Sequence, residues 1–203
     1  MYFNYGNEEI EFLKKRDKTL GAAIDRIGHI HCETDSDLFA SVIRHIIGQQ
    51  ISMKAQYTIW QRLCNALPTV DAAAICALES DELQRFGMTF KKADYIKEFA
   101  EKVRSGAFDI DALHEMSDDA VIKELSSLSG IGVWTAEMLM TFCMQRPNIV
   151  SYGDLAILRG MRMLYRHRNI DKVASLYLWR ISNGAIPELT DPAPKKKKEA
   201  GKK

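Results

Sequence analysis

Apolar residues recur at helical spacing along most of the chain. From Phe39 to Ile47 the spacing is i, i+3, i+4, i+7 and i+8, which marks one face of a helix: Phe39, Val42, Ile43, Ile46 and Ile47. Similar spacing and polar N-cap residues predict further helices over 55–67, 93–104, 117–125, 133–145 and 155–167. No long alternation of apolar and polar residues suggests a strand. We therefore predict an all-α protein of about ten helices joined by short loops.

Composition is typical of a soluble globular protein and excludes several classes. The 203 residues are 46% hydrophobic and 27% charged, enough for one large domain or two small ones. No run of 18 apolar residues predicts a membrane helix, and the N-terminus lacks a secretion signal pattern. The four cysteines lack C-x-x-C spacing, which favours reduced, buried thiols over disulfides or a metal cluster. We expect a cytoplasmic protein.

Positive charge gathers toward the C-terminal end, although the formal net charge is only +1. From Arg146 to Arg180 there are seven Lys or Arg against two acids, and from Thr190 onward six Lys against two acids. Such a distribution suits binding to a polyanion, but a solvated helix face explains it equally well. We predict that residues 191–203 form a disordered Lys-rich tail, which either attracts phosphates or only aids solubility.

Two glycines flank one apolar residue in LSGIGVWTAEML, residues 128–139. Gly130 and Gly132 predict a tight turn with positive φ between two helices, anchored in the core by Ile131. Such a turn leaves backbone N–H groups accessible at the start of the next helix, where they can bind a phosphate. A plain helix–turn–helix connection would use the same residues.

The longer stretch LSSLSGIGVWTAEM resembles the helix–hairpin–helix motif of the endonuclease-III-like DNA glycosylase superfamily, L-P-G-[IV]-G-x-x-T-A. Thr135 matches that pattern, and Ser129 replaces its proline. The superfamily carries an essential aspartate about twenty residues later, and here Asp154 follows Gly132 by 22 residues. HIIGQQIS, FGMTFKKADYI and LYLWRIS are similar to motifs of its 3-methyladenine DNA glycosylase II branch.

This resemblance implies an architecture. The expected fold is all-α, with two helical subdomains, a helix–hairpin–helix motif and an active site in the cleft between the subdomains. We expect one glycosylase domain over 1–190, in which 36–115 form one subdomain and 1–35 with 116–190 form the other. The expected partner is double-stranded DNA containing damaged bases, bound by a monomer in a bacterial cytoplasm, at the nucleoid.

The resemblance also implies the chemistry. Relatives that cut the DNA strand carry a lysine where this chain has Trp134, so Schiff-base chemistry is absent and a monofunctional enzyme is expected. Asp154 would stabilise the positive charge that develops on the sugar as an alkylated purine leaves. Because Asp154 precedes a predicted helix, it is also an ordinary N-cap, and the two roles can coexist.

Further residues are assigned by the same resemblance. Trp134, Met138 and Trp179 would line the pocket for the flipped base. The segment between residues 166 and 176 is shorter than in relatives, so the position of Trp179 relative to Asp154 stays open.

Four polar residues would contact the duplex. Gln49 or Gln50 would fill the gap left by the flipped base, although both could instead cap a helix. Arg159 and Arg162 form a basic stripe with Arg166 that suits backbone phosphates.

No redox cofactor, catalytic metal or iron–sulfur cluster is expected, although the hairpin carbonyls could hold Na⁺ or K⁺ when DNA is bound. Two alternatives remain: a glycosylase for deaminated, mismatched or oxidised bases, and a non-catalytic helix–hairpin–helix DNA-binding module. The second alternative would need no aspartate at position 154.

Overall fold

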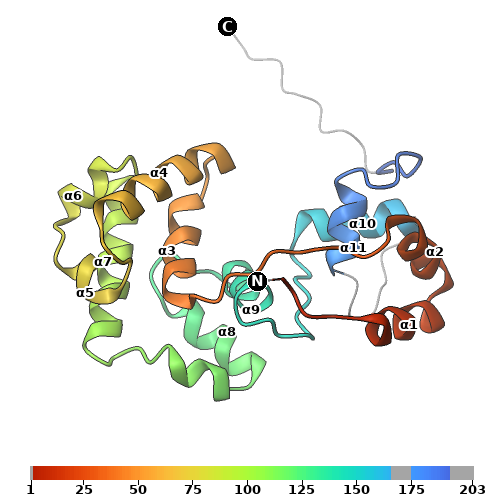
Figure 1. Ribbon diagram of the computed structural model, residues 1–203, viewed down its shortest axis with the longest axis horizontal. Coiled ribbons are helices and arrows are strands. Elements are labelled where there is room, and N and C mark those ends of the chain that lie inside the picture. The colour runs from red at the N-terminus through yellow and green to blue at the C-terminus, as the bar shows by residue number, and fades with distance from the viewer. Residues whose placement is uncertain (1, 166–174, 193–203) are drawn as a thin grey trace, which may run out of the picture. The chain divides into compact units, whose positions relative to one another are not determined.

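The computed structural model describes residues 2–165 and 175–192, and most of these residues lie in helices (Figure 1). Within these ranges the only β-type pairing is one isolated antiparallel bridge between Tyr2 and Glu33, so the all-α prediction is confirmed. The helices, with one short 3₁₀ helix η1, are α1 Asn7–Arg16, α2 Lys18–Ile27, α3 Leu38–Gly48, α4 Met53–Ala66, α5 Ala72–Cys76, α6 Ser80–Arg85, α7 Phe90–Arg104, η1 Asp111–Glu115, α8 Asp118–Ser126, α9 Val133–Phe142, α10 Leu155–Tyr165 and α11 Ser175–Ser182.

The chain divides into two compact units. Unit 1 contains Glu33–Ile149 with the first residues of the chain, and unit 2 contains Asn4–Cys32 with the described residues from Val150 onward. The predicted division assigned 116–149 to the subdomain of the N- and C-terminal segments, but these residues belong to unit 1. The physical reason is that Val121, Leu125 and Leu139 are fully buried in the same core as α3 and α7.

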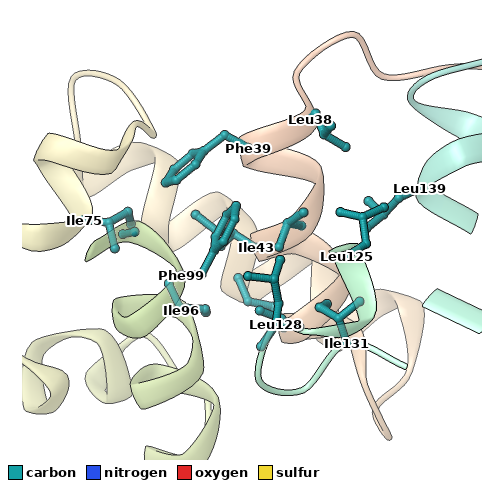
Figure 2. Packing of buried hydrophobic residues seen from close by; sticks show 14 of the residues in the cluster. Leu38, Phe39, Ile43, Ile75, Ile96, Phe99, Leu125, Leu128, Ile131 and Leu139 are labelled. Atoms are coloured by element: carbon teal, nitrogen blue, oxygen red, sulfur yellow. The ribbon is translucent and has the colours of Figure 1, made fainter. Parts of the chain in front are cut away.

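Unit 1 is built around α3. Its residues Ile43, Ile46 and Ile47 have no exposed surface, and each contributes about 1.5–3 kcal/mol by leaving water. Figure 2 shows side chains from α3, α5, α7, α8 and α9 meeting in this core, together with Leu128 and Ile131 of the loop between α8 and α9. That loop is therefore anchored from inside the unit, as predicted for Ile131.

Polar N-caps set where most of these helices begin. At the start of six helices, a side-chain oxygen of the capping residue accepts a hydrogen bond from a backbone N–H of the first turn. The capping residues of α2, α3, α4, α5, α7 and α8 are, in that order, Asp17, Asp37, Ser52, Asp71, Thr89 and Ser117. The sequence analysis assigned no helix to the segments that form α1, α2, α5, α6, η1 and α11. It also extended α9 to residue 145, but the helix ends at Phe142 and Gln145 adopts a positive φ of 53°.

Unit 2 consists of α1, α2, α10 and α11. The apolar faces of α2, α10 and α11 share a core that includes Leu20, Ile157 and Tyr177. The helices α10 and α11 approach so closely at Gly160 that a Cβ there would lie 2.1 Å from the backbone oxygen of Leu178. Only glycine fits at this crossing, and the close packing fixes α11 against α10. The predicted end of α10 at residue 167 lies outside the described residues.

Candidate functional site

Asp154 is a buried carboxylate at the N-terminus of α10. The residue is only 7% exposed. Its Oδ1 atom accepts hydrogen bonds from the backbone N–H groups of Ala156 (2.8 Å) and Ile157 (2.9 Å). The structure therefore confirms the N-cap. These N–H groups and the positive end of the helix dipole both favour the ionised carboxylate.

Trp179 of α11 completes the surroundings of that carboxylate. Its indole Nε1–H donates to Asp154 Oδ1 at 3.0 Å, and its ring packs partly buried against the unit 2 core. The short segment before α11 thus does not separate Trp179 from Asp154, which settles the position that the sequence left open. Trp179 lies where it orients Asp154; its predicted contact with a flipped base stays a prediction.

The two glycines of the hairpin between α8 and α9 differ in backbone conformation and in the space around them. Gly130 has φ +83°, and a Cβ there would lie 2.4 Å from the ring of Tyr95, so both backbone and space require glycine. Gly132 has φ −97° in an extended conformation, and a Cβ would meet nothing within 4 Å. The prediction of positive φ is therefore confirmed for Gly130 and wrong for Gly132, because the turn is already completed before Gly132.

Gly132 leaves the N-terminus of α9 without a side-chain cap. It is the N-cap of α9 and offers no side chain, so no side-chain oxygen caps this helix. The first turn of α9 also contains no acidic residue. The N-terminus of α9 is consequently a positive helix end without its own anion, as a phosphate site requires.

Three predicted residues lie on α9 within unit 1. Trp134 is half exposed, whereas Thr135 and Met138 are buried. Trp134 and Met138 are four residues apart and so lie on the same side of the helix. The large exposed indole surface is unusual for a residue with only a packing role.

The two glutamines of HIIGQQIS have different environments. Gln49 Nε2 donates to the backbone oxygen of Gly130 at 2.6 Å, which joins the loop after α3 to the hairpin. Gln50 is exposed and has a positive φ of 58°, an uncommon conformation for a residue with a side chain. The side chain of Gln49 is thus engaged in structure, while Gln50 stands at the tip of the loop.

One functional candidate was missed by the sequence analysis. Lys92 lies within the quoted motif FGMTFKKADYI, but no role was assigned to it. Its Nζ donates to the backbone oxygens of Ile47 (2.8 Å) and Gln49 (2.6 Å), and burial lowers the pKa of its ammonium group. Only tertiary structure reveals this contact, since 43 residues separate Lys92 from Gln49.

A hollow of about 380 Å³ lies beside these groups within unit 1. It is lined by the loop after α3, the start of α7 and the hairpin, through Gln49, Gln50, Ile51, Thr89, Lys91, Lys92, Tyr95 and Gly130. The hairpin also lies against α7, because the ring of Tyr95 packs at Gly130, next to Ser129, which replaces the family's proline. Lys102 and then Ser129 lower the pKa of the Glu98 carboxyl.

The predicted basic stripe on α10 is partly neutralised. Arg162 donates from Nε and Nη2 to both carboxylate oxygens of Asp191, at 2.9 and 2.8 Å, and Arg159 Nε lies 3.9 Å from the same carboxylate. Asp191 was predicted to begin the disordered tail, but this ion pair holds it against α10. Arg166 and residues 193–203 lie outside the described residues.

The remaining sequence predictions concern metals, thiols and membranes. No group of three or more His, Cys, Asp or Glu side chains in the described ranges is arranged to hold a metal ion. All four cysteines are free, but each is only partly buried, and burial raises the pKa of the Cys143 thiol to about 11. In the part of the chain that the structure describes, no helix has the length and apolar character needed to cross a membrane.

Comparisons with known proteins agree on the fold. The family model for the HhH-GPD superfamily base excision DNA repair protein matches residues 43–181. DNA-3-methyladenine glycosylase 1 of Schizosaccharomyces pombe is 27% identical, and the match covers 78% of each chain. Two relatives from Bacillus subtilis are longer, and the match spans 59% and 57% of their lengths.

Two solved structures are similar over nearly the whole chain. A DNA-3-methyladenine glycosidase from Bacillus halodurans superposes with a TM-score of 0.82 at 28% identity, covering 93% of this chain and 95% of that one. Mag1, the 3-methyladenine DNA glycosylase of Schizosaccharomyces pombe, solved in complex with abasic DNA, gives a TM-score of 0.74 at 23% identity, covering 87% and 97%. The latter match bears on the fold alone.

Proposed function

Because the chain belongs to the HhH-GPD superfamily of base excision DNA repair proteins, we propose that it is a monofunctional DNA glycosylase that removes alkylated purines. The observation that carries the proposal is the Asp154 carboxylate, which three N–H donors hold at the N-terminus of α10. The similarity to 3-methyladenine glycosylases from fission yeast and Bacillus halodurans supports this class of substrate.

The proposed reaction is hydrolysis of the N-glycosidic bond. The bond between the sugar C1′ and the base nitrogen breaks, the base leaves with both electrons, and positive charge develops on the sugar. Asp154 stabilises that charge with its fixed negative charge. A water oxygen then bonds to C1′ while the proton of that water passes to Asp154 or to solvent, which leaves an abasic site.

The other residues are proposed to bind and open the duplex. The uncapped N-terminus of α9 at Gly132 would bind a backbone phosphate, and the exposed Trp134 would stack on the electron-poor purine. Of the two glutamines, Gln50 is the one proposed to fill the vacated position, since the Gln49 side chain is bonded to Gly130. Arg159 would contribute a phosphate contact more readily than Arg162, whose guanidinium is paired with Asp191.

We also propose that the hairpin holds Na⁺ or K⁺ when DNA is bound. Backbone carbonyls are suitable ligands for these ions. The oxygen of Gly130 already accepts from Gln49, so the ion would use other carbonyls of residues 127–132. DNA affinity measured in Na⁺, K⁺ and a bulky organic cation at equal ionic strength tests this point. The proposal further places the protein in the cytoplasm as a monomer acting at the nucleoid.

A lesion panel tests the function. Duplexes carrying single 3-methyladenine, 7-methylguanine, hypoxanthine, uracil or 8-oxoguanine are incubated with the parent protein and with Asp154→Asn. We expect release of the methylated purines, with strands that break only after hot alkali. Strand cleavage without alkali would contradict a monofunctional enzyme. Binding without release on every lesion would favour a DNA-binding module, and equal release by Asp154→Asn would refute the mechanism.

A further inference from the structure

The loop after α3 is held by a lysine from another helix. The last carbonyls of a helix have no partner within it, and a cation at that end also complements the helix dipole. Lys92, in the first turn of α7, supplies both the donor and the positive charge. Its ammonium group donates to the backbone oxygens of Ile47 and Gln49 at 2.8 and 2.6 Å. One side chain thereby holds the backbone on both sides of Gly48.

The same face of α7 also supports the hairpin. Tyr95, three residues after Lys92, packs its ring against Gly130, where a Cβ would find no space. The loop and the hairpin are then joined directly by the bond from Gln49 Nε2 to the oxygen of Gly130. Helix α7 thus fixes both segments within unit 1.

Gln50 lies between these contacts in a strained conformation. A non-glycine residue at φ +58° costs about 1–2 kcal/mol and persists only where its surroundings hold it. Lys92 fixes the carbonyl of the preceding residue, and the N–H of Ile51 donates to the oxygen of Gly48 at 3.5 Å. The loop is therefore fixed on the inner side while Gln50 remains exposed.

We infer that Lys92 is a positioning residue that holds the loop 48–51 in the conformation which presents Gln50 to the duplex. Lys92 acts through the loop backbone and does not itself contact the reacting atoms. This inference rests on the proposed function, in which Gln50 fills the position of the flipped base.

The test compares binding to two duplexes that differ only at one position. One duplex is undamaged and the other carries a tetrahydrofuran analogue of an abasic site. We expect Lys92→Met to lower the preference for the abasic duplex about tenfold, the lower end of the range for losing a hydrogen bond from a charged group. Lys92→Arg should restore most of the preference, because a guanidinium also donates to carbonyls. Lys92→Gln, whose amide is shorter, is measured in parallel in case Lys92→Met does not fold.

Lys97 provides a matched control on the same helix. Its ammonium group donates to the backbone oxygen of Leu78 at 2.8 Å, far along the sequence from the loop 48–51. Lys97→Met should lower the melting temperature about as much as Lys92→Met does, while the preference for the abasic duplex is unchanged. An equal loss of preference in both variants would reduce Lys92 to a general structural role and overturn the inference.

The outcomes also separate this inference from the proposed function. If the parent releases no base from any lesion but Lys92→Met still loses its preference, the function is wrong and the inference stands. If the parent is active and Lys92→Met retains the parent's preference, the inference alone is wrong. A parent without any preference for the abasic duplex would overturn the inference as well, since Gln50 would then not enter the vacated position.

Discussion

The N-termini of α9 and α10 are built in opposite ways. Each follows a turn and offers the positive end of a helix dipole. At α10 the chain fills that position with its own buried carboxylate, Asp154, which accepts two backbone N–H groups. At α9 the N-cap is Gly132, and no side chain caps the helix. The same local electrostatics therefore have two outcomes: α10 stabilises a negative charge of the protein, and α9 keeps an uncapped N-terminus, to which our proposal assigns a phosphate of the ligand.

Asp154→Asn should have the largest effect on excision, because it removes the negative charge at the start of α10. Asparagine caps a helix about as well as aspartate, so we expect little change in melting temperature. Excision should fall by roughly 10²- to 10³-fold, the usual effect of removing one electrostatic contact to a transition state. Single-turnover excision and thermal denaturation of the same preparations check both expectations. Asp154→Ala should lose the cap as well, at about 0.5–2 kcal/mol of stability; equal stability of the two variants would mean that capping is unimportant.

Gly130→Ala and Gly132→Ala distinguish the two glycines of the hairpin. At Gly130 alanine would be strained at φ +83° and would press on the Tyr95 ring, so we expect a loss of roughly 2–4 kcal/mol. At Gly132 the extended backbone and open space should keep the change within about 0.5 kcal/mol. Urea denaturation measures both values. A destabilisation by Gly132→Ala as large as that by Gly130→Ala would contradict the assignment.

Gly132→Asp would make the start of α9 resemble that of α10. The extended φ and the open space accept the side chain, and an aspartate cap should leave stability unchanged or raise it by a few tenths of a kcal/mol. DNA affinity should fall at least about tenfold, because the new carboxylate repels the phosphate. Gly132→Asn is the control that adds a cap without charge. Titrations with a labelled duplex at several salt concentrations would refute the phosphate site if all three proteins bind alike.

Trp179→Phe should lower excision less than Asp154→Asn does. The ring remains to pack against the unit 2 core, but Asp154 Oδ1 loses one of its three donors. We expect the maximal excision rate to fall roughly three- to tenfold, less than the full loss of a hydrogen bond to a charged group, because two backbone N–H groups still hold Oδ1. Saturation kinetics separate the outcomes: a change confined to KM would assign Trp179 to base binding and not to the orientation of Asp154.

The sequence predicted those features that depend on local pattern. The polar N-caps, the buried Ile131 and the end of the helix predicted over 55–67 follow from residues within one or two turns. Family resemblance singled out Asp154, 22 residues after Gly132, and its joint role with the hairpin stays a prediction. Even here a local rule failed at Gly132, because two glycines around one residue do not reveal which of them completes the turn.

Contacts between distant segments could not be predicted in this way. The ion pair between Arg162 and Asp191 joins residues 29 positions apart, so the sequence did not show that Arg162 is already paired. Lys92 and Gln49 likewise act through backbone oxygens, which carry no residue-specific signal in a sequence. The assignment of 116–149 to unit 1 depended on which apolar faces pack together, and periodicity does not specify the partner of a face.

The three donors that converge on Asp154 Oδ1 determine when its side chain loses conformational entropy. A carboxylate held by two main-chain N–H groups of its own helix and by an indole loses its side-chain rotational freedom during folding. In the proposed reaction it would therefore not have to be reoriented in every catalytic cycle. A glycosylase that tests many undamaged bases for each damaged one would gain from this arrangement, because each encounter would meet a carboxylate that is already aligned.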